Sequence, residues 1–138
     1  MLHFSKDEDY AVILVNALAK NYKKRLVPLS EIAEEYKLSL FYLRNLANKL
    51  IHKRIIKAVE GKKGGYFLIK GPQEIKIGEI ISVFNKKKIL ACCSVGDKKG
   101  PCKRAAFCET GHIWKKLNEE FYIRISNLSL TEFMEKKK

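Results

Sequence analysis

Residues 28–70, PLSEIAEEYKLSLFYLRNLANKLIHKRIIKAVEGKKGGYFLIK, contain the pattern that decides the fold. Pro28 opens a short helix, which we expect over Glu31–Tyr36. A tight connection follows, and Ser39 is expected to cap a second helix over Leu40–Lys53, because its hydroxyl can accept a hydrogen bond from an amide of the first turn. Two helices at this spacing predict a helix-turn-helix unit.

The second helix of this unit has an apolar face and a polar face. Leu43, Leu46 and Leu50 recur at helical spacing, so they are expected in the core. The opposite face carries the donors, cations and aromatic edges that can contact bases and phosphates in a major groove. A polar outer face is also common on helices that bind no DNA, so this pattern alone does not decide. The expected DNA contacts are Ser39, Phe41, Tyr42, Arg44, Asn45, Asn48 and Lys49.

A β-hairpin is predicted directly after the second helix. Residues 55–60 and 66–70 have the composition of strands, and the glycines of the connection over 61–65 permit a tight reversal. A hairpin in this order of elements is a wing, whose tip residues Lys62 and Lys63 are expected near phosphates or a minor groove. The alternative is an ordinary hairpin with solvated lysines.

Composition restricts the partners. The chain has 138 residues and a formal net charge of +13, which fits one domain, or a domain with an appendage, that binds a polyanion. Nucleic acid is the first candidate and an anionic membrane the second. The acidic start Asp7-Glu8-Asp9 excludes the basic beginning of a secretory signal, and no apolar run approaches the roughly 18 residues of a membrane span. We therefore expect a cytoplasmic protein with no membrane partner.

The cysteines of the chain lie in one segment, residues 85–111, which has little periodicity. Thiolates gathered in this way are typical ligands of iron-sulfur clusters or zinc in a reducing compartment. A cysteine pair that oxidises to a disulfide is the alternative, favoured by the neighbouring cations Lys98, Lys99, Lys103 and Arg104. The cysteines are Cys92, Cys93, Cys102 and Cys108.

Three further helices are predicted outside the helix-turn-helix, the hairpin and the cysteine segment. A helix is expected over residues 6–22, capped by Ser5 and Glu8, and a short one over residues 75–84. From Ile113 onward a stripe of large apolar residues returns, which suits either a dimerisation helix or packing on the chain's own core. The stripe consists of Trp114, Leu117, Phe121, Ile125 and Leu128.

The sequence thus predicts a mainly α fold with a small β-hairpin wing: a winged helix-turn-helix with a long C-terminal dimerisation helix. We expect a DNA-binding domain over residues 1–84, a cysteine-rich cluster-binding loop over 85–111, and a dimerisation helix and tail over 112–138. No paired carboxylates near a histidine, no nucleotide-binding glycine pattern and no zinc-deaminase motif are present in the sequence. An enzyme is therefore not expected.

These residues together resemble the Rrf-two family of bacterial winged-helix transcriptional regulators, which includes IscR-like and NsrR-like members. The resemblance runs in order along almost the whole chain. It is carried by Phe4-Ser5-Lys6, Asp9-Tyr10-Ala11, Ser30-Glu31-Ile32-Ala33, Tyr42-Leu43, Gly64-Gly65-Tyr66, Gly78-Glu79-Ile80-Ile81, the cysteine segment and Trp114-Lys115-Lys116-Leu117-Asn118.

The resemblance implies a homodimer that binds a palindromic double-stranded DNA operator and holds a two-iron or four-iron cluster. Carried over by position, the cluster ligands are Cys102, Cys108 and either Cys92 or Cys93. The fourth ligand is Asp9 by analogy with the nitric-oxide-responsive branch, reaching the cluster of the partner subunit, with His112 as the rival and Glu8 as a further candidate. An acidic residue in a first helical turn is also favourable simply through the helix dipole.

The chain departs from the family pattern at two places. Glu60 stands before the wing glycine where members often have arginine, and the first cysteine gap is longer than in the assembly-repressor branch. We expect a regulator, in the first instance a repressor, whose operator affinity is controlled by a cluster that senses nitric oxide, redox or iron-sulfur status. The alternative is a cluster-free regulator of the same fold that works by thiol oxidation or contains zinc.

Overall fold

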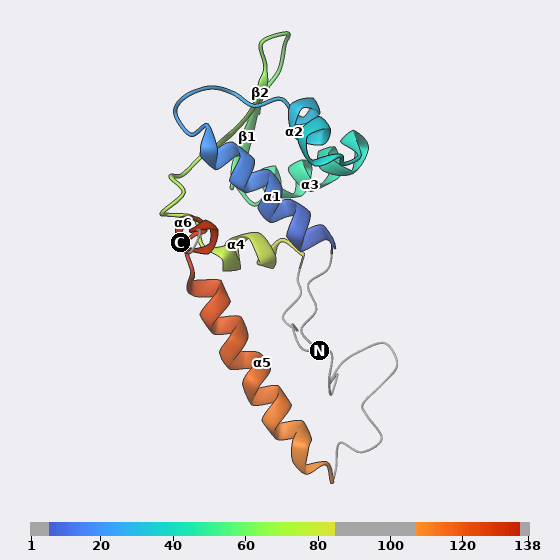
Figure 1. The fold of residues 1–138 in the computed structure, drawn as a ribbon, viewed down its shortest axis with the longest axis vertical. Coiled ribbons are helices and arrows are strands. Elements are labelled where there is room, and N and C mark those ends of the chain that lie inside the picture. The colour runs from blue at the N-terminus through green and yellow to red at the C-terminus, as the bar shows by residue number, and fades with distance from the viewer. Residues whose placement is uncertain (1–5, 85–106, 136–138) are drawn as a thin grey trace.

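The computed structural model describes residues 6–84 and 107–135. Over these ranges the chain is mainly helical with one two-stranded antiparallel hairpin, which confirms the predicted fold class. Figure 1 shows a compact part, residues 6–84, that contains the winged helix-turn-helix and is called the head. A long helix extends away from the head. The elements are α1 (Lys6–Lys20), α2 (Leu29–Tyr36), α3 (Leu40–His52), β1 (Ile56–Val59), β2 (Gly65–Leu68), α4 (Ile77–Ser82), α5 (Glu109–Asn127) and α6 (Leu130–Met134).

Helix α1 forms the centre of the head. Its first turn is acidic and its last turn ends in Lys20, an arrangement that suits the helix dipole. Ala11, Leu14 and Leu18 are buried, and α1 packs against α3, β2 and α4. Glu8 is only 4% exposed, whereas Ser5, its expected partner in a capping box, lies outside the described residues.

The apolar core joins all the elements of the head. Leu43 and Leu50 from α3, Ile56 from β1 and Ile80 from α4 are fully buried beside the α1 side chains. Burying side chains of this size contributes roughly 1.5 to 3 kcal/mol each relative to exposure. The core therefore fixes α3 and the hairpin in one rigid unit.

The chain returns to the head after α5. The Ile77 amide donates to the Leu128 carbonyl oxygen at 2.8 Å, and the Leu130 amide donates to the Ile75 carbonyl oxygen at 2.8 Å. The Leu130 side chain is 1% exposed and belongs to the head core. These contacts attach the C-terminal end of α5 to the segment that leads into α4.

The short helix α6 was not predicted as a separate element. Ser129 and Glu132 form a capping box: the Ser129 Oγ accepts from the Glu132 amide at 3.1 Å, and Glu132 Oε2 accepts from the Ser129 amide at 2.8 Å. The hydrogen bond from the Ser129 backbone holds the pKa of Glu132 below its usual value. The sequence Ser129-Leu130-Thr131-Glu132 carried this signal.

Helix α5 projects from the head with its N-terminal end farthest away (Figure 1). It begins at Glu109, earlier than the start near Ile113 that the sequence predicts. The prediction rests on the apolar stripe, and the first turn of the helix has no large apolar side chain to extend that stripe. None of its residues is buried within the described chain. No helix in the described ranges is long and apolar enough to cross a membrane.

Candidate nucleic-acid interface and cysteine site

Helices α2 and α3 form the predicted helix-turn-helix. Lys37 ends α2 in the left-handed conformation with φ 54°, and its amide and that of Leu38 both donate to the Ala33 carbonyl oxygen. This reversal leads directly to Ser39, whose Oγ accepts from the Tyr42 amide at 3.3 Å. The cap predicted at Ser39 is therefore confirmed.

The polar face of α3 is presented to solvent. Phe41 is 74% exposed, and Arg44, Asn45, Asn48 and Lys49 are exposed as well. Lys49 Nζ lies over the Phe84 ring, 5.6 Å from its centre, where the negative face of the ring attracts the ammonium group. The side chains predicted to contact DNA are thus accessible, apart from that of Tyr42.

Tyr42 is half-buried and contacts α1. Its hydroxyl donates to Asp7 Oδ1, and its ring meets the Tyr10 ring edge-on, with centroids 5.6 Å apart and an interplanar angle of 86°. Asp7 and Tyr42 are 35 residues apart in sequence, so no local pattern signals this contact. The role of Tyr42 as a direct DNA contact stays a prediction, and Asp7 is a residue that sequence reasoning missed.

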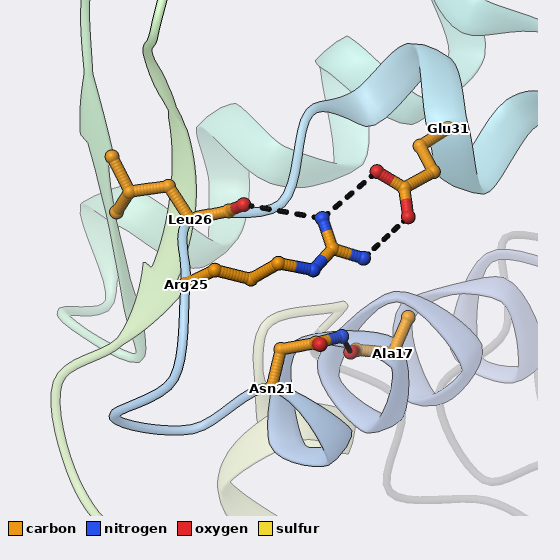
Figure 2. Close-up of polar contacts among 5 residues, drawn as sticks. All are labelled: Ala17, Asn21, Arg25, Leu26 and Glu31. Carbon is orange, nitrogen blue, oxygen red and sulfur yellow. Dashed lines mark hydrogen bonds and ion pairs between the residues drawn. The ribbon is translucent and has the colours of Figure 1, made fainter.

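A bidentate ion pair fixes the loop between α1 and α2 (Figure 2). Arg25 Nη1 and Nη2 donate to the two carboxylate oxygens of Glu31 at 3.0 and 2.5 Å, and Nη1 also donates to the Leu26 carbonyl oxygen at 3.4 Å. This hydrogen bonding raises the pKa of Arg25 and lowers the pKa of Glu31. Both side chains are about half exposed, so the pair orients the start of α2 more than it stabilises the fold.

The α1 end of the same loop is closed by a side-chain hydrogen bond. Asn21 Nδ2 donates to the Ala17 carbonyl oxygen at 3.2 Å, as Figure 2 shows. This bond satisfies one of the carbonyl groups that a helix leaves unpaired at its C-terminus. Neither Asn21 nor the Arg25–Glu31 pair was marked by a recognisable sequence motif.

The wing is built on the register Ile56↔Leu68 to Val59↔Gly65. On the other side of β2, Val27 forms a single antiparallel bridge with Tyr66. The Val27 and Tyr66 amides donate to each other's carbonyl oxygens at 3.0 and 2.8 Å. The connection starts with Gly61 at φ 113°, a conformation that favours glycine. Lys62 and Lys63 are exposed at its tip, as predicted from the sequence.

Wing and α5 lie at opposite ends of the molecule (Figure 1). The hairpin projects beyond the helices of the head, and α2 and α3 lie beside it. The exposed cations of α3 and of the wing therefore belong to the head, while α5 leaves it on the other side. Such a head can contact a duplex without obstruction from α5.

Three of the predicted metal ligands lie outside the described residues: Cys92, Cys93 and Cys102. The predicted ligand Cys108 lies within the described residues: it is the N-cap residue of α5 and is half-buried, with its Sγ 3.3 Å from Thr110 Oγ1. His112 is exposed one helical turn further on, and Asp9 is exposed in the first turn of α1. Within residues 6–84 and 107–135, no three His, Cys, Asp or Glu side chains come together to hold a metal ion.

Comparisons with known proteins agree with this architecture. The sequence matches the Rrf2 family, described as an iron-dependent transcriptional regulator, over residues 4–136. It is 32% identical over 125 residues to the HTH-type transcriptional regulator IscR of Klebsiella pneumoniae (strain 342), covering 91% of this chain and 75% of that protein.

Two solved structures are similar as well. T. potens IscR superimposes with a TM-score of 0.72 at 28% identity, covering 96% of this chain and 86% of that one. The oxidized form of Staphylococcus aureus CymR superimposes with a TM-score of 0.75 at 28% identity and covers 99% of both chains. The family is one of transcriptional regulators rather than enzymes. The chain belongs to the Rrf2 family and is a DNA-binding transcriptional regulator.

Proposed function

We propose that the chain represses transcription and that an iron-sulfur cluster controls its affinity for an operator. The proposed ligands are Cys102, Cys108 and one of Cys92 and Cys93, with Asp9 or His112 completing the site. The observation that carries the proposal is the position of Cys108, at the start of a helix that leaves the head and in a family described as iron-dependent.

The described donors suit such a cluster chemically. A thiolate carries negative charge, which the N-terminus of α5 favours at Cys108. The imidazole of His112 on the same helix and the carboxylate of Asp9 are both exposed. A bound cluster, with two or four irons, would supply an inorganic centre that reacts with oxidants and nitric oxide.

The proposal includes a homodimer. The exposed side chains Ile113, Trp114 and Leu117 lie on the part of α5 that is far from the head, whereas Ile125 and Leu128 pack on the head core. A helix with no fully buried residue in its own chain, whose far part displays large apolar side chains, suits pairing with a second copy. Two heads related by a two-fold axis fit a palindromic operator on double-stranded DNA.

Anaerobic purification tests the cluster directly. We expect a brown protein that contains iron and acid-labile sulfide, measured colorimetrically and by absorption spectroscopy. Zinc without sulfide would replace the cluster with a zinc site. A colourless protein that binds no iron after reconstitution would contradict the proposal.

A thiol switch is the second candidate, favoured by the likeness to the oxidized form of S. aureus CymR. In this version Cys92 or Cys93 forms a disulfide with Cys102 or Cys108, and an oxidant such as peroxide takes up the two electrons that the thiols lose. Mass spectrometry of the metal-free protein after mild peroxide treatment would detect the pair. A reversible loss of two hydrogens per chain that tracks operator release would favour this version over the cluster.

The wing lysines should contribute to DNA affinity regardless of sequence. We expect Lys62→Ala and Lys63→Ala each to weaken binding to operator and random DNA alike, because a lysine at the wing tip contacts phosphate rather than a base edge. The slope of log affinity against log salt concentration, measured by fluorescence anisotropy, should become shallower by about 0.9 for each lost phosphate contact. Lys115→Ala, on α5, is the matched control. Weakened binding to the operator alone would instead indicate that the lysines read sequence.

A further inference from the structure

The hydroxyl of Tyr42 does not share the outward direction of the polar face of α3. It donates to Asp7 Oδ1 in the first turn of α1, and the Tyr42 ring packs edge-on against Tyr10 of the same helix. Edge-to-face packing is favourable because the positive ring edge meets the negative ring face. The first turn of α1 therefore holds Tyr42 through a polar and an aromatic contact.

Tyr42 lies in the first turn of α3, which is the part of a recognition helix that reaches base edges. Its amide donates to Oγ of the N-cap residue Ser39, and its hydroxyl donates to Asp7 of α1. A phenol has one proton to donate, so Tyr42 cannot donate to Asp7 and to a base at the same time. While the Asp7 bond exists, the hydroxyl serves to orient the helix.

We infer that Asp7 is a positioning residue for operator recognition: it accepts the Tyr42 hydroxyl and so fixes the first turn of α3 against α1. The inference rests on the proposal that α3 reads the operator. Asp9, a candidate cluster ligand, lies in the same turn of α1 as Asp7.

A double-mutant cycle separates positioning from direct contact. We expect Asp7→Ala and Tyr42→Phe each to lower operator affinity roughly threefold to tenfold, the range of one hydrogen bond. The double variant should lose no more than either single variant, because both remove the same bond. Binding to random DNA should stay unchanged, since a misplaced recognition helix leaves the phosphate contacts available.

Two further variants make the cycle specific. Asp7→Asn keeps a carbonyl oxygen that can accept from Tyr42 while it removes the charge, so its operator affinity should return close to that of the unmodified chain. Asn21→Ala removes the side-chain hydrogen bond at the other end of α1 and should leave operator affinity unchanged. Urea unfolding of every variant would show that all are folded under the binding conditions.

The opposite pattern would overturn the inference. If Tyr42 contacts a base directly, Tyr42→Phe lowers operator affinity while Asp7→Ala leaves it equal or raises it. Additive losses of affinity in the double variant would also show that the two residues act independently. A different result would show that α3 does not read the operator at all. In that case Arg44→Ala and Asn45→Ala would also leave operator affinity unchanged, and the inference about Asp7 would be wrong together with the proposed role of α3.

Discussion

Replacing Gly64 with alanine should distort the wing and lower operator affinity by about tenfold or more. A Cβ at this position would overlap the Val59 carbonyl oxygen and lie 2.9 Å from the Gly61 carbonyl oxygen. Both are backbone atoms, so no side-chain rotation relieves the contact and the hairpin connection itself must move. Overpacking of this kind typically costs about 1 to 3 kcal/mol.

The effect on DNA binding follows from the position of Gly64 beside the wing tip. Its amide donates to the Gly61 carbonyl oxygen at 3.0 Å and closes the connection that carries Lys62 and Lys63. Opening this connection displaces both lysines. Urea unfolding and operator titration would measure the two effects on the same samples.

Gly61→Ala is the matched control for this prediction. A Cβ at Gly61 meets nothing within 4 Å, although the positive φ imposes a strain of about 1 to 2 kcal/mol. The connection can therefore keep its path, and operator affinity should fall much less than in Gly64→Ala. Equal affinities for Gly64→Ala and the unmodified chain would show that the wing takes no part in binding.

The second large effect is expected from Leu117→Glu on α5. Leu117 is 44% exposed within the chain and lies in the apolar stripe that we propose to pair with a second copy. A buried, unpaired carboxylate is strongly unfavourable, so the variant should be monomeric. Loss of the second head should then lower operator affinity by roughly a hundredfold, because two linked heads bind far more tightly than one.

The head itself should be insensitive to this substitution, because Leu117 is not part of the head core. Sedimentation velocity would report the oligomeric state, and thermal unfolding at one protein concentration would check the fold. Lys116→Glu introduces the same residue outside the stripe and should remain dimeric. A dimeric Leu117→Glu variant with normal operator affinity would contradict the proposed interface.

Local signals in the sequence were sufficient to predict the helix-turn-helix and the hairpin of the head. Ser39 predicted a cap and forms one, and the spacing of Leu43, Leu46 and Leu50 placed the buried face of α3 correctly. The glycines around Lys62 and Lys63 located the hairpin reversal. Each of these features depends on residues close together in sequence, where periodicity and capping chemistry are informative.

Contacts between distant segments were not predictable in the same way. The Asp7–Tyr42 bond depends on how α1 and α3 are placed in space, which no local pattern encodes. The stripe on α5 was read as one surface, but Ile125 and Leu128 serve the head core while Trp114 and Leu117 remain exposed. Sequence periodicity identifies an apolar face and does not show what covers each part of it.

The cysteine site was predicted as a set of residue types rather than as a geometry. The structure places Cys108 at the start of α5, and the remaining cysteines fall outside the described residues. Spacing in a segment without periodicity does not fix distances between sulfur atoms. The choice between Cys92 and Cys93, and between Asp9 and His112, therefore stays a prediction.

Operator affinity measured as a function of cluster content tests the central claim most directly. The unmodified chain and the Cys102→Ser/Cys108→Ser variant would be titrated with operator DNA anaerobically, before and after nitric oxide or chelator removes the cluster. We predict that the affinity of the unmodified chain changes with cluster loss, while the variant has one affinity throughout. A variant whose operator affinity responds to these treatments as the unmodified chain does would contradict the account.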